Sequence, residues 1–288
     1  MAGQQWKEAI TAYSAAIEKK PGNAEFYYKR GIAYRSSTNY DLAIADMSQA
    51  IKLEPDFARA YMARALVYSL VNELNLAMAD MDNALNRDPM LAKYVEPDMA
   101  PAYYRLGIAY RQQGRNVNAV AFLSKSINLE YKAAEAYIER SKIYTLNRQT
   151  ELAIADLTKA IKSNPESALA YNLRGAAYVS KNEFSEALVD LDRAISIDAS
   201  LAEAYSNRGW VYYNLKDYES AIKDLNAAIK LDPAPALSYY YRGLLYLAEA
   251  KNDLAIADFK KTEELTTDPV LRNKAEQSLM SIPTSKQQ

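Results

Sequence analysis

The sequence lacks cysteine and histidine altogether, in a chain of 288 residues. Without cysteine there are no disulfides and no thiol nucleophiles, and without histidine there is no imidazole acid–base catalysis. Zinc sites built from these two residues are excluded as well. Catalysis would have to use carboxylate, lysine or serine groups, and no motif gathers them. We therefore expect no enzymatic activity, no cofactor and no metal.

The chain also lacks long apolar runs and an excess of charge of one sign. No apolar run approaches the roughly 18 residues of a membrane-spanning helix. Lys and Arg number 35 against 36 Asp and Glu, a net charge of −1, and no long basic run occurs. Because phosphate binding needs a concentrated positive face, we expect no nucleic-acid partner and no membrane insertion. The cytoplasm is the favoured location, although a signal sequence upstream of this chain would not be visible.

Glycine is scarce too, and five of the eight glycines occupy the same place in an internal repeat. The repeat has a spacing of 34 residues, and one copy follows eight extra residues. A period of this length indicates a solenoid, because one unit cannot bury its apolar face without its neighbours. The copies begin at Ala24, Ala58, Ala100, Ala134, Ala168, Ala202 and Ala236.

Each copy has the pattern of two amphipathic helices. When the copy at Ala202 is numbered from 1, its marker residues are spaced by three or four within each half, which places them on one helix face. A polar turn at 214–217 separates the halves, and Pro233 ends the second helix because proline cannot continue it. The markers are Tyr205 (position 4), Arg208 (7), Gly209 (8), Tyr212 (11), Ala221 (20), Leu225 (24), Ala228 (27) and Pro233 (32).

These markers resemble the tetratricopeptide repeat (TPR), which has an aromatic residue at position 4, Gly or Ala at 8, Tyr at 11, Ala at 20 and 27, and Pro at 32. The resemblance covers residues 4–267. It implies an all-α fold, a right-handed superhelical solenoid of antiparallel helix pairs whose first helices line a concave groove. A solenoid of this kind forms one elongated body.

The repeats divide the chain into a TPR solenoid at 1–267, a capping helix at 268–282 and a disordered tail at 283–288. The solenoid has seven full repeats, and residues 4–21 match only the second helix of a repeat. This half repeat suggests a fragment of a longer protein or a trimmed start.

Eight residues, 92–99, interrupt the period before the copy at Ala100. With Pro97 and Pro101 nearby, a continuous helix is not expected there. The insertion is either a tolerated loop, since loops lengthen at little cost, or a binding lip or dimer contact that uses Tyr94 and Val95.

Two positions of the repeat change together within this one chain. Position 7 is Arg and position 23 is Asp in six copies, whereas the copy at Ala100 has Leu106 and Phe122 at these positions. We therefore predict a contact between positions 7 and 23, a partly buried ion pair in each of the six copies. The predicted pairs are Arg30–Asp46, Arg64–Asp80, Arg140–Asp156, Arg174–Asp190, Arg208–Asp224 and Arg242–Asp258.

In the TPR family, positions 2, 5, 9 and 12 of the first helix face the ligand. On this chain they predict a groove with large apolar and aromatic side chains and the cations Arg35, Arg111 and Lys142. Such a surface suits an extended or helical peptide with apolar anchors and some acidic character; alternatively, the groove narrows and these side chains pack on one another. The candidate groove residues are Tyr28, Arg35, Met62, Tyr104, Ile108, Arg111, Lys142, Asn172, Trp210, Tyr213 and Tyr240.

The resemblance favours a non-enzymatic scaffold for protein–protein interaction that holds a peptide segment or a partner helix in this groove. The carboxylate clamp of some TPR proteins is absent, because the copy at Ala168 has Asn172 and Ala176 where Lys and Asn are needed. Two alternatives remain: a substrate-recruiting or regulatory segment of a larger enzyme, and a self-assembling oligomer that docks through the unpaired helix at 4–20.

Overall fold

The computed structural model describes residues 2–282, with side chains from Gln5 onward. This part of the chain contains sixteen α-helices and two short 3-10 helices, and no strand. The all-α fold expected from the repeats is confirmed. The predicted disordered tail at 283–288 lies outside the described residues.

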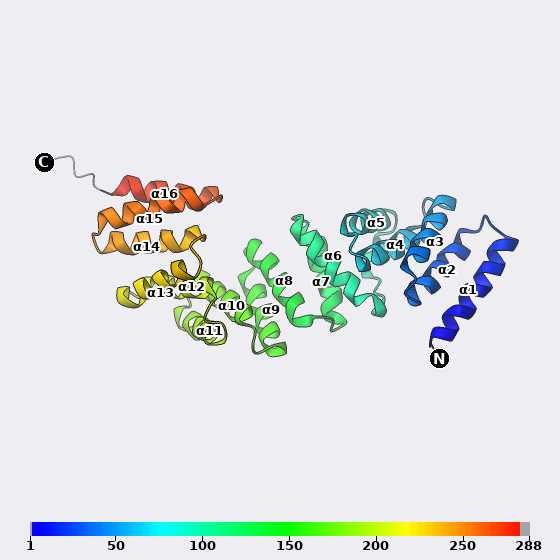
Figure 1. The fold of residues 1–288 in the computed structure, drawn as a ribbon, viewed down its shortest axis with the longest axis horizontal. Helices are drawn as coiled ribbons and strands as arrows, with labels where there is room; N and C mark the ends of the chain where they lie inside the picture. The colour runs from blue at the N-terminus through cyan, green and yellow to red at the C-terminus, as the bar shows by residue number, and fades with distance from the viewer. Residues whose placement is uncertain (1, 283–288) are drawn as a thin grey trace. The chain divides into compact units, whose positions relative to one another are not determined.

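The helices form two compact units, which divide within one helix between Ile143 and Tyr144. The first unit (unit 1; blue to green in Figure 1) contains α1 (Ala2–Lys19), α2 (Ala24–Ser36), α3 (Tyr40–Leu53), α4 (Ala58–Leu70), α5 (Leu74–Arg87), η1 (Pro89–Lys93), η2 (Pro97–Met99), α6 (Ala100–Gln112), α7 (Asn116–Asn128) and most of α8 (Ala133–Leu146). The second unit (unit 2; green to red) contains the end of α8, α9 (Thr150–Ser163), α10 (Ala168–Ser180), α11 (Phe184–Ile197), α12 (Ala202–Asn214), α13 (Tyr218–Leu231), α14 (Ala236–Ala248), α15 (Asn252–Leu265) and α16 (Pro269–Ser281). The single elongated solenoid stays a prediction.

Within each unit, the two helices of a repeat pack as a pair, and the turns between first and second helices are of the same tight kind. One residue of every turn has a positive φ, always at position 15 of the repeat. Only one copy has glycine there, so the other turns hold a residue with a side chain in the left-handed region. These residues are Thr38, Asn72, Gly114, Arg148, Asn182, Lys216 and Ala250.

Glycine at position 8 lets the two helices of a repeat approach closely. A Cβ built on Gly175 would lie 2.8 Å from Cγ of Leu191 on the second helix, which is closer than real contacts allow. Leu191 is fully buried by this approach. The close packing explains a glycine in the middle of a helix, where it costs about 1 kcal/mol against alanine.

The predicted contact between positions 7 and 23 is confirmed in five repeats. In each, Nε and Nη2 of the arginine donate to the two carboxylate oxygens of the aspartate sixteen residues later, at 2.6–2.9 Å. The aspartates are buried and the arginines are half-buried. Arg140 and Asp156 belong to different units, and their pairing stays a prediction.

The same arginines also reach the preceding repeat, a contact that the sequence pattern does not predict. Nη1 of Arg174 donates to Oγ1 of Thr158 (3.0 Å), and Nη1 of Arg208 donates to Oδ1 of Asp192 (2.7 Å). The acceptor lies sixteen residues before the arginine, at position 25 of the preceding repeat. The six acceptors are Ser14, Ser48, Ser124, Thr158, Asp192 and Asn226.

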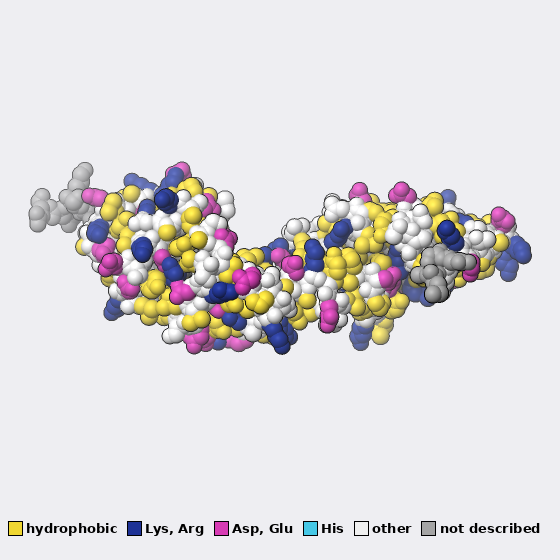
Figure 2. Space-filling model, turned by 60° about the horizontal axis from the view of Figure 1, so that its bottom comes forward, with side chains coloured by type: hydrophobic (Ala, Val, Ile, Leu, Met, Phe, Trp, Pro, Cys, Tyr) yellow, Lys and Arg dark blue, Asp and Glu magenta, His cyan; other side chains and the backbone are white. Residues whose placement is uncertain are grey.

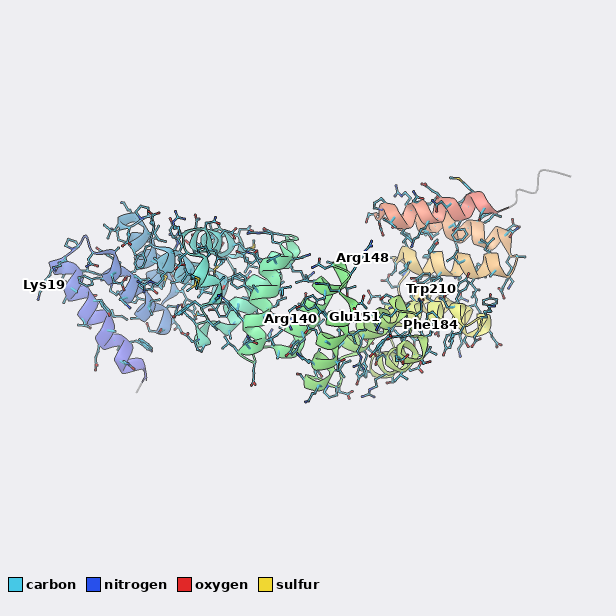
Figure 3. All side chains as sticks on the ribbon, turned by 180° about the vertical axis from the view of Figure 1, so that it is seen from behind. Lys19, Arg140, Arg148, Glu151, Phe184 and Trp210 are labelled. Atoms are coloured by element: carbon cyan, nitrogen blue, oxygen red, sulfur yellow. The ribbon has the colours of Figure 1, made fainter. Side chains whose placement is uncertain are left out.

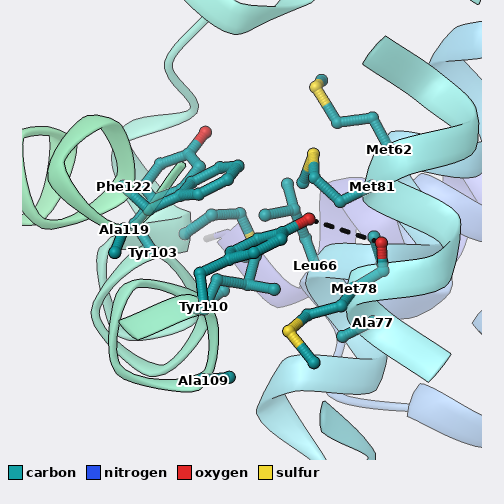
Figure 4. Packing of buried hydrophobic residues seen from close by; sticks show 14 of the residues in the cluster. Met62, Leu66, Ala77, Met78, Met81, Tyr103, Ala109, Tyr110, Ala119 and Phe122 are labelled. Carbon is teal, nitrogen blue, oxygen red and sulfur yellow. Dashed lines mark hydrogen bonds between the residues drawn. The ribbon is translucent and has the colours of Figure 1, made fainter. Parts of the chain in front are cut away.

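The repeat that starts at Ala100 replaces the ion pair with an aromatic stack (Figure 4). Phe122 lies against Tyr103 and Tyr110, with ring centroids 6.2 and 5.4 Å apart and nearly parallel planes. The hydroxyl of Tyr110 donates to the carbonyl of Met78, and it also bonds to Asp82, the position-25 residue of the preceding repeat. The covariation of Leu106 and Phe122 thus reflects a change from polar to apolar packing.

The insertion at 92–99 folds into parts of two 3-10 helices joined by extended residues. The expectation that no continuous helix crosses this segment is confirmed. Leu91 and Met99 at its ends are buried in the largest apolar cluster of unit 1.

Candidate functional site

The candidate groove residues of unit 1 are more covered than the sequence predicts. Met62 is 2% exposed and Arg35 is 5% exposed, whereas Met62 was expected at the surface. Met62 lies in the apolar cluster that α4 forms with α5, α6, α7, α8 and the ends of the insertion, which explains its burial. Tyr28, Tyr104, Ile108, Arg111 and Lys142 are half-buried.

Each of the three predicted groove cations is paired with a glutamate of this chain. Nη2 of Arg35 lies 2.5 Å from a carboxylate oxygen of Glu96 in the insertion. Nε of Arg111 and Nζ of Lys142 each lie 2.8 Å from the carboxylate of Glu139. Because Arg111 and Lys142 share one glutamate, the positive charge expected to attract an acidic ligand in unit 1 is compensated in part by this chain's own carboxylates.

The aromatic candidates of unit 1 pack on neighbouring side chains. Tyr28 lies 5.0 Å from the ring of Phe57, and Tyr104 lies 6.2 Å from Tyr131, the residue that replaces the repeat proline. Burial is the main cause that raises the pKa of Tyr28 to about 12, and the nearby carboxylate of Glu96 adds to it. Its hydroxyl is therefore neutral at physiological pH.

Unit 2 has a hollow of about 440 Å³ between the first helices of three repeats and α16. Six of its lining residues occupy positions 2, 5, 9 or 12, which face the ligand in the TPR family. The lining residues are Ala176, Val179 and Ser180 of α10, Asn207 and Trp210 of α12, Leu237, Tyr240, Tyr241 and Leu244 of α14, and Leu271 and Lys274 of α16.

Trp210 is the centre of an aromatic stack beside this hollow. Its ring stacks on those of Tyr213 (5.1 Å between centroids) and Tyr241 (4.4 Å), and both planes are nearly parallel to it. Figure 3 labels Trp210 on α12, next to α14. All three rings are half-buried, and Trp210 and Tyr241 line the hollow.

One lining residue of the hollow, Asn207, is held by a hydrogen bond to a buried side chain. Asn172 is 3% exposed and accepts a hydrogen bond at Oδ1 from Nδ2 of Asn207 (2.9 Å). Burial raises the pKa of Tyr241 to about 12, so this phenol stays protonated at neutral pH. The only charged group of the lining is the ammonium of Lys274. The hollow therefore combines apolar and aromatic walls with an amide and one cation.

Other kinds of site are not seen within residues 2–282. No group of three acidic side chains is placed to hold a metal ion, and no helix there is long and apolar enough to cross a membrane. On the face shown in Figure 2, Lys and Arg side chains alternate with Asp and Glu in each unit.

Five residues of the hollow were not identified from the sequence. Ser180, Asn207 and Tyr241 are each one place beyond a ligand position of the family, and Leu271 and Lys274 belong to the predicted capping helix. The spacing of three residues between Leu271 and Lys274 places them on one face of α16. Nothing in the sequence shows that this face turns toward α14.

Comparison with known proteins links the chain to one repeat family. Models described as tetratricopeptide repeat or TPR repeat match residues 1–37, 24–57, 100–132, 134–167, 175–216 and 202–235. No curated protein matches the chain.

Solved structures share the fold. YrrB, described as a TPR protein with an unusual peptide-binding site, is 24% identical, with a TM-score of 0.51 over 68% of this chain and 97% of its own. A tetratricopeptide repeat protein from Parabacteroides merdae is 16% identical, with a TM-score of 0.55 over 90% of this chain and 99% of its own. A thermophilic TPR protein from Thermus thermophilus is 21% identical, with a TM-score of 0.54 over 63% and 99%.

Proposed function

Because this chain belongs to the tetratricopeptide repeat family, we propose that it is a non-enzymatic interaction scaffold that binds an extended peptide of a partner protein in the hollow of unit 2. The repeats and their structural neighbours support an interaction scaffold in general. The location of the peptide and the chemical character of its side chains are proposed from the residues of the hollow.

The observation that carries the proposal is the half-buried aromatic stack beside the hollow. Trp210, Tyr213 and Tyr241 form a rigid surface whose conformational entropy has already been lost on folding. Aromatic side chains held in this way are typical of the residues that contribute most to binding at interfaces. The corresponding positions of α4 in unit 1 are fully buried, so the same family positions offer no such surface there.

The lining indicates the chemistry of the ligand. An aliphatic or aromatic side chain would pack against Trp210 and Leu244, and Asn207 would hydrogen-bond to the peptide backbone. An acidic group next to that side chain would pair with Lys274. The proposed ligand is thus an extended segment with an apolar anchor and a neighbouring carboxylate.

Selection from a library of random peptides tests this proposal. The full chain should enrich sequences that carry an apolar anchor beside Asp or Glu, and Trp210→Ala should abolish their binding. Trp6→Ala in α1 is the matched control and should leave the affinity unchanged. Lys274→Ala should reduce the preference for acidic residues while retaining the apolar anchor. Equal binding by Trp210→Ala would place the site elsewhere.

A further inference from the structure

Within unit 1, the insertion packs over repeat positions of α4 whose equivalents in α12 of unit 2 are less buried. Val95 packs against the apolar cluster that holds Met62 and Leu66 of α4, together with Leu91 and Met99 at the ends of the insertion. Met62 and Leu66, at positions 5 and 9 of their repeat, are at most 2% exposed. In unit 2, position 9 of the repeat at Ala202 is the half-buried Trp210. Val95 therefore packs against the cluster that contains positions 5 and 9 of this repeat.

The segment has the conformation and the contacts of a bound peptide. Tyr94 and Glu96 have extended backbones, with φ and ψ of −73° and 135° and of −96° and 116°. The carbonyl of Tyr94 accepts a hydrogen bond from Nζ of Lys125 (2.8 Å). The N–H of Glu96 donates to the hydroxyl of Tyr103 (2.8 Å), and its carboxylate pairs with Arg35.

The fit between Arg35 and Glu96 is incomplete. In the five scaffold pairs, the arginine uses Nε and Nη2 to hold both oxygens of its aspartate. Arg35 approaches Glu96 through Nη2 alone, and this same nitrogen lies 3.5 Å from Oδ2 of Asp98. Its Nε and Nη1 are buried and have no hydrogen-bond partner among the described residues. Buried donors of a charged group without partners are costly, so a carboxylate that engages the guanidinium side-on would bind better.

We propose that residues 94–98 are an internal ligand of unit 1: they occupy a binding face centred on Arg35, and when they are displaced this face takes an extended acidic peptide of a partner protein. The partner supplies an Asp or Glu side chain that pairs with Arg35 through two nitrogens. The site shares no residue with the hollow of unit 2.

The segment is built in a way that permits displacement. Tyr94 is 52% exposed as a residue, and the side chain of Asp98 is 58% exposed. Because the segment is tethered at both ends, it competes at a high effective concentration, on the order of millimolar. A partner peptide in solution therefore binds this face only when the contacts of residues 94–98 are weakened or when the peptide binds more tightly than they do.

Binding of a peptide added in solution tests the proposal. The probe is a labelled synthetic peptide with the sequence of residues 92–99, and its binding to the full chain is followed by fluorescence anisotropy. Glu96→Gln weakens the internal segment and should raise the affinity for the probe about 10-fold or more over the wild type. Adding Arg35→Gln should abolish this gain, and a probe with Gln in place of its Glu should not bind.

Two controls separate displacement from damage to the fold. Glu73→Gln changes an exposed glutamate of the same unit and should not alter probe binding. A second open variant replaces residues 94–98 with a glycine–serine linker of equal length and keeps Leu91 and Met99. If Glu96→Gln and the linker variant both remain helical by circular dichroism but bind the probe peptide no better than the wild type, the proposal is wrong. Loss of folded structure in both would also overturn it, because the segment would then be an essential part of the core.

Discussion

Arg174 and Asp190 face each other across the two helices of one repeat, and Nε and Nη2 of the arginine each lie 2.7 Å from one carboxylate oxygen. The side chain of Asp190 is 3% exposed, so its charge is almost fully removed from water. The hydrogen bond to Asp190 is the main cause that raises the pKa of Arg174. Such a pair is strongly coupled, because either charge alone would be left buried without its partner.

Removal of one partner should destabilise unit 2 markedly. We expect Arg174→Leu to lower the free energy of unfolding by about 3 kcal/mol, since it leaves the carboxylate of Asp190 buried and unpaired. The double change with Asp190→Phe should recover part of this loss, because Tyr171 and Tyr178 can stack on the new ring as Tyr103 and Tyr110 stack on Phe122. Urea unfolding of the single and double variants measures the coupling, and strictly additive losses would contradict the contact.

The glycine at position 8 should not tolerate a methyl group. Gly175→Ala gains helix propensity, but its Cβ would lie 2.8 Å from Leu191, so the helices must separate. We expect a net loss of about 1–3 kcal/mol in the free energy of unfolding. Gly22→Ala is the matched control, because no atom lies within 4 Å of the place that its new methyl group would take. Equal stability of the two variants by thermal unfolding would show that the added methyl group at position 175 does not destabilise the packing of the two helices.

The buried ammonium of Lys125 should make stability depend on pH. Burial lowers the pKa of Lys125 to about 8, from 10.5, and its neighbours include the rings of Tyr103 and Phe122 and the carbonyl of Tyr94. Between these two values the unfolded chain binds more protons than the folded one, so stability rises with pH. The loss of stability caused by burying the charged ammonium of Lys125 is fully present below about pH 8 and decreases to zero as the pH rises toward 10.5.

Comparison with Lys125→Met isolates this effect from other titrating groups. From about pH 7 to about pH 9.5, the free energy of unfolding of the wild type should rise relative to that of the variant. Chemical unfolding at several pH values measures the difference. A difference that stays constant across this range would mean that Lys125 keeps an ordinary pKa.

Most of the scaffold can be predicted from the sequence because the same marker residues recur at the same positions in each repeat. The joint change of Leu106 and Phe122 is sufficient to identify the contact of positions 7 and 23. The hydrogen bond to position 25 is harder to find, because Ser, Thr, Asp and Asn all serve as acceptors. One signal exists: the last repeat has Lys260 at this position, and the residue sixteen places later is Glu276 instead of an arginine.

The candidate sites depend on contacts that the repeat does not encode. Asp98 lies 63 residues from Arg35, and the insertion has no periodicity that would show where its chain returns. The family positions place Arg35 at the ligand face, but only the folded chain shows Glu96 against it. In the same way, the approach of Lys274 to the hollow follows from how α16 packs on α14 and α15.

The most direct test of the proposed function uses Trp210 as its own reporter. The chain has two tryptophans, so Trp6→Phe leaves Trp210 as the only one. A peptide selected by the full chain is titrated into this variant, and tryptophan emission and its quenching by acrylamide are measured. Binding in the hollow should shift the emission and protect Trp210 from the quencher in step with occupancy. Saturable binding that leaves both signals unchanged would contradict a peptide site at the aromatic stack of unit 2.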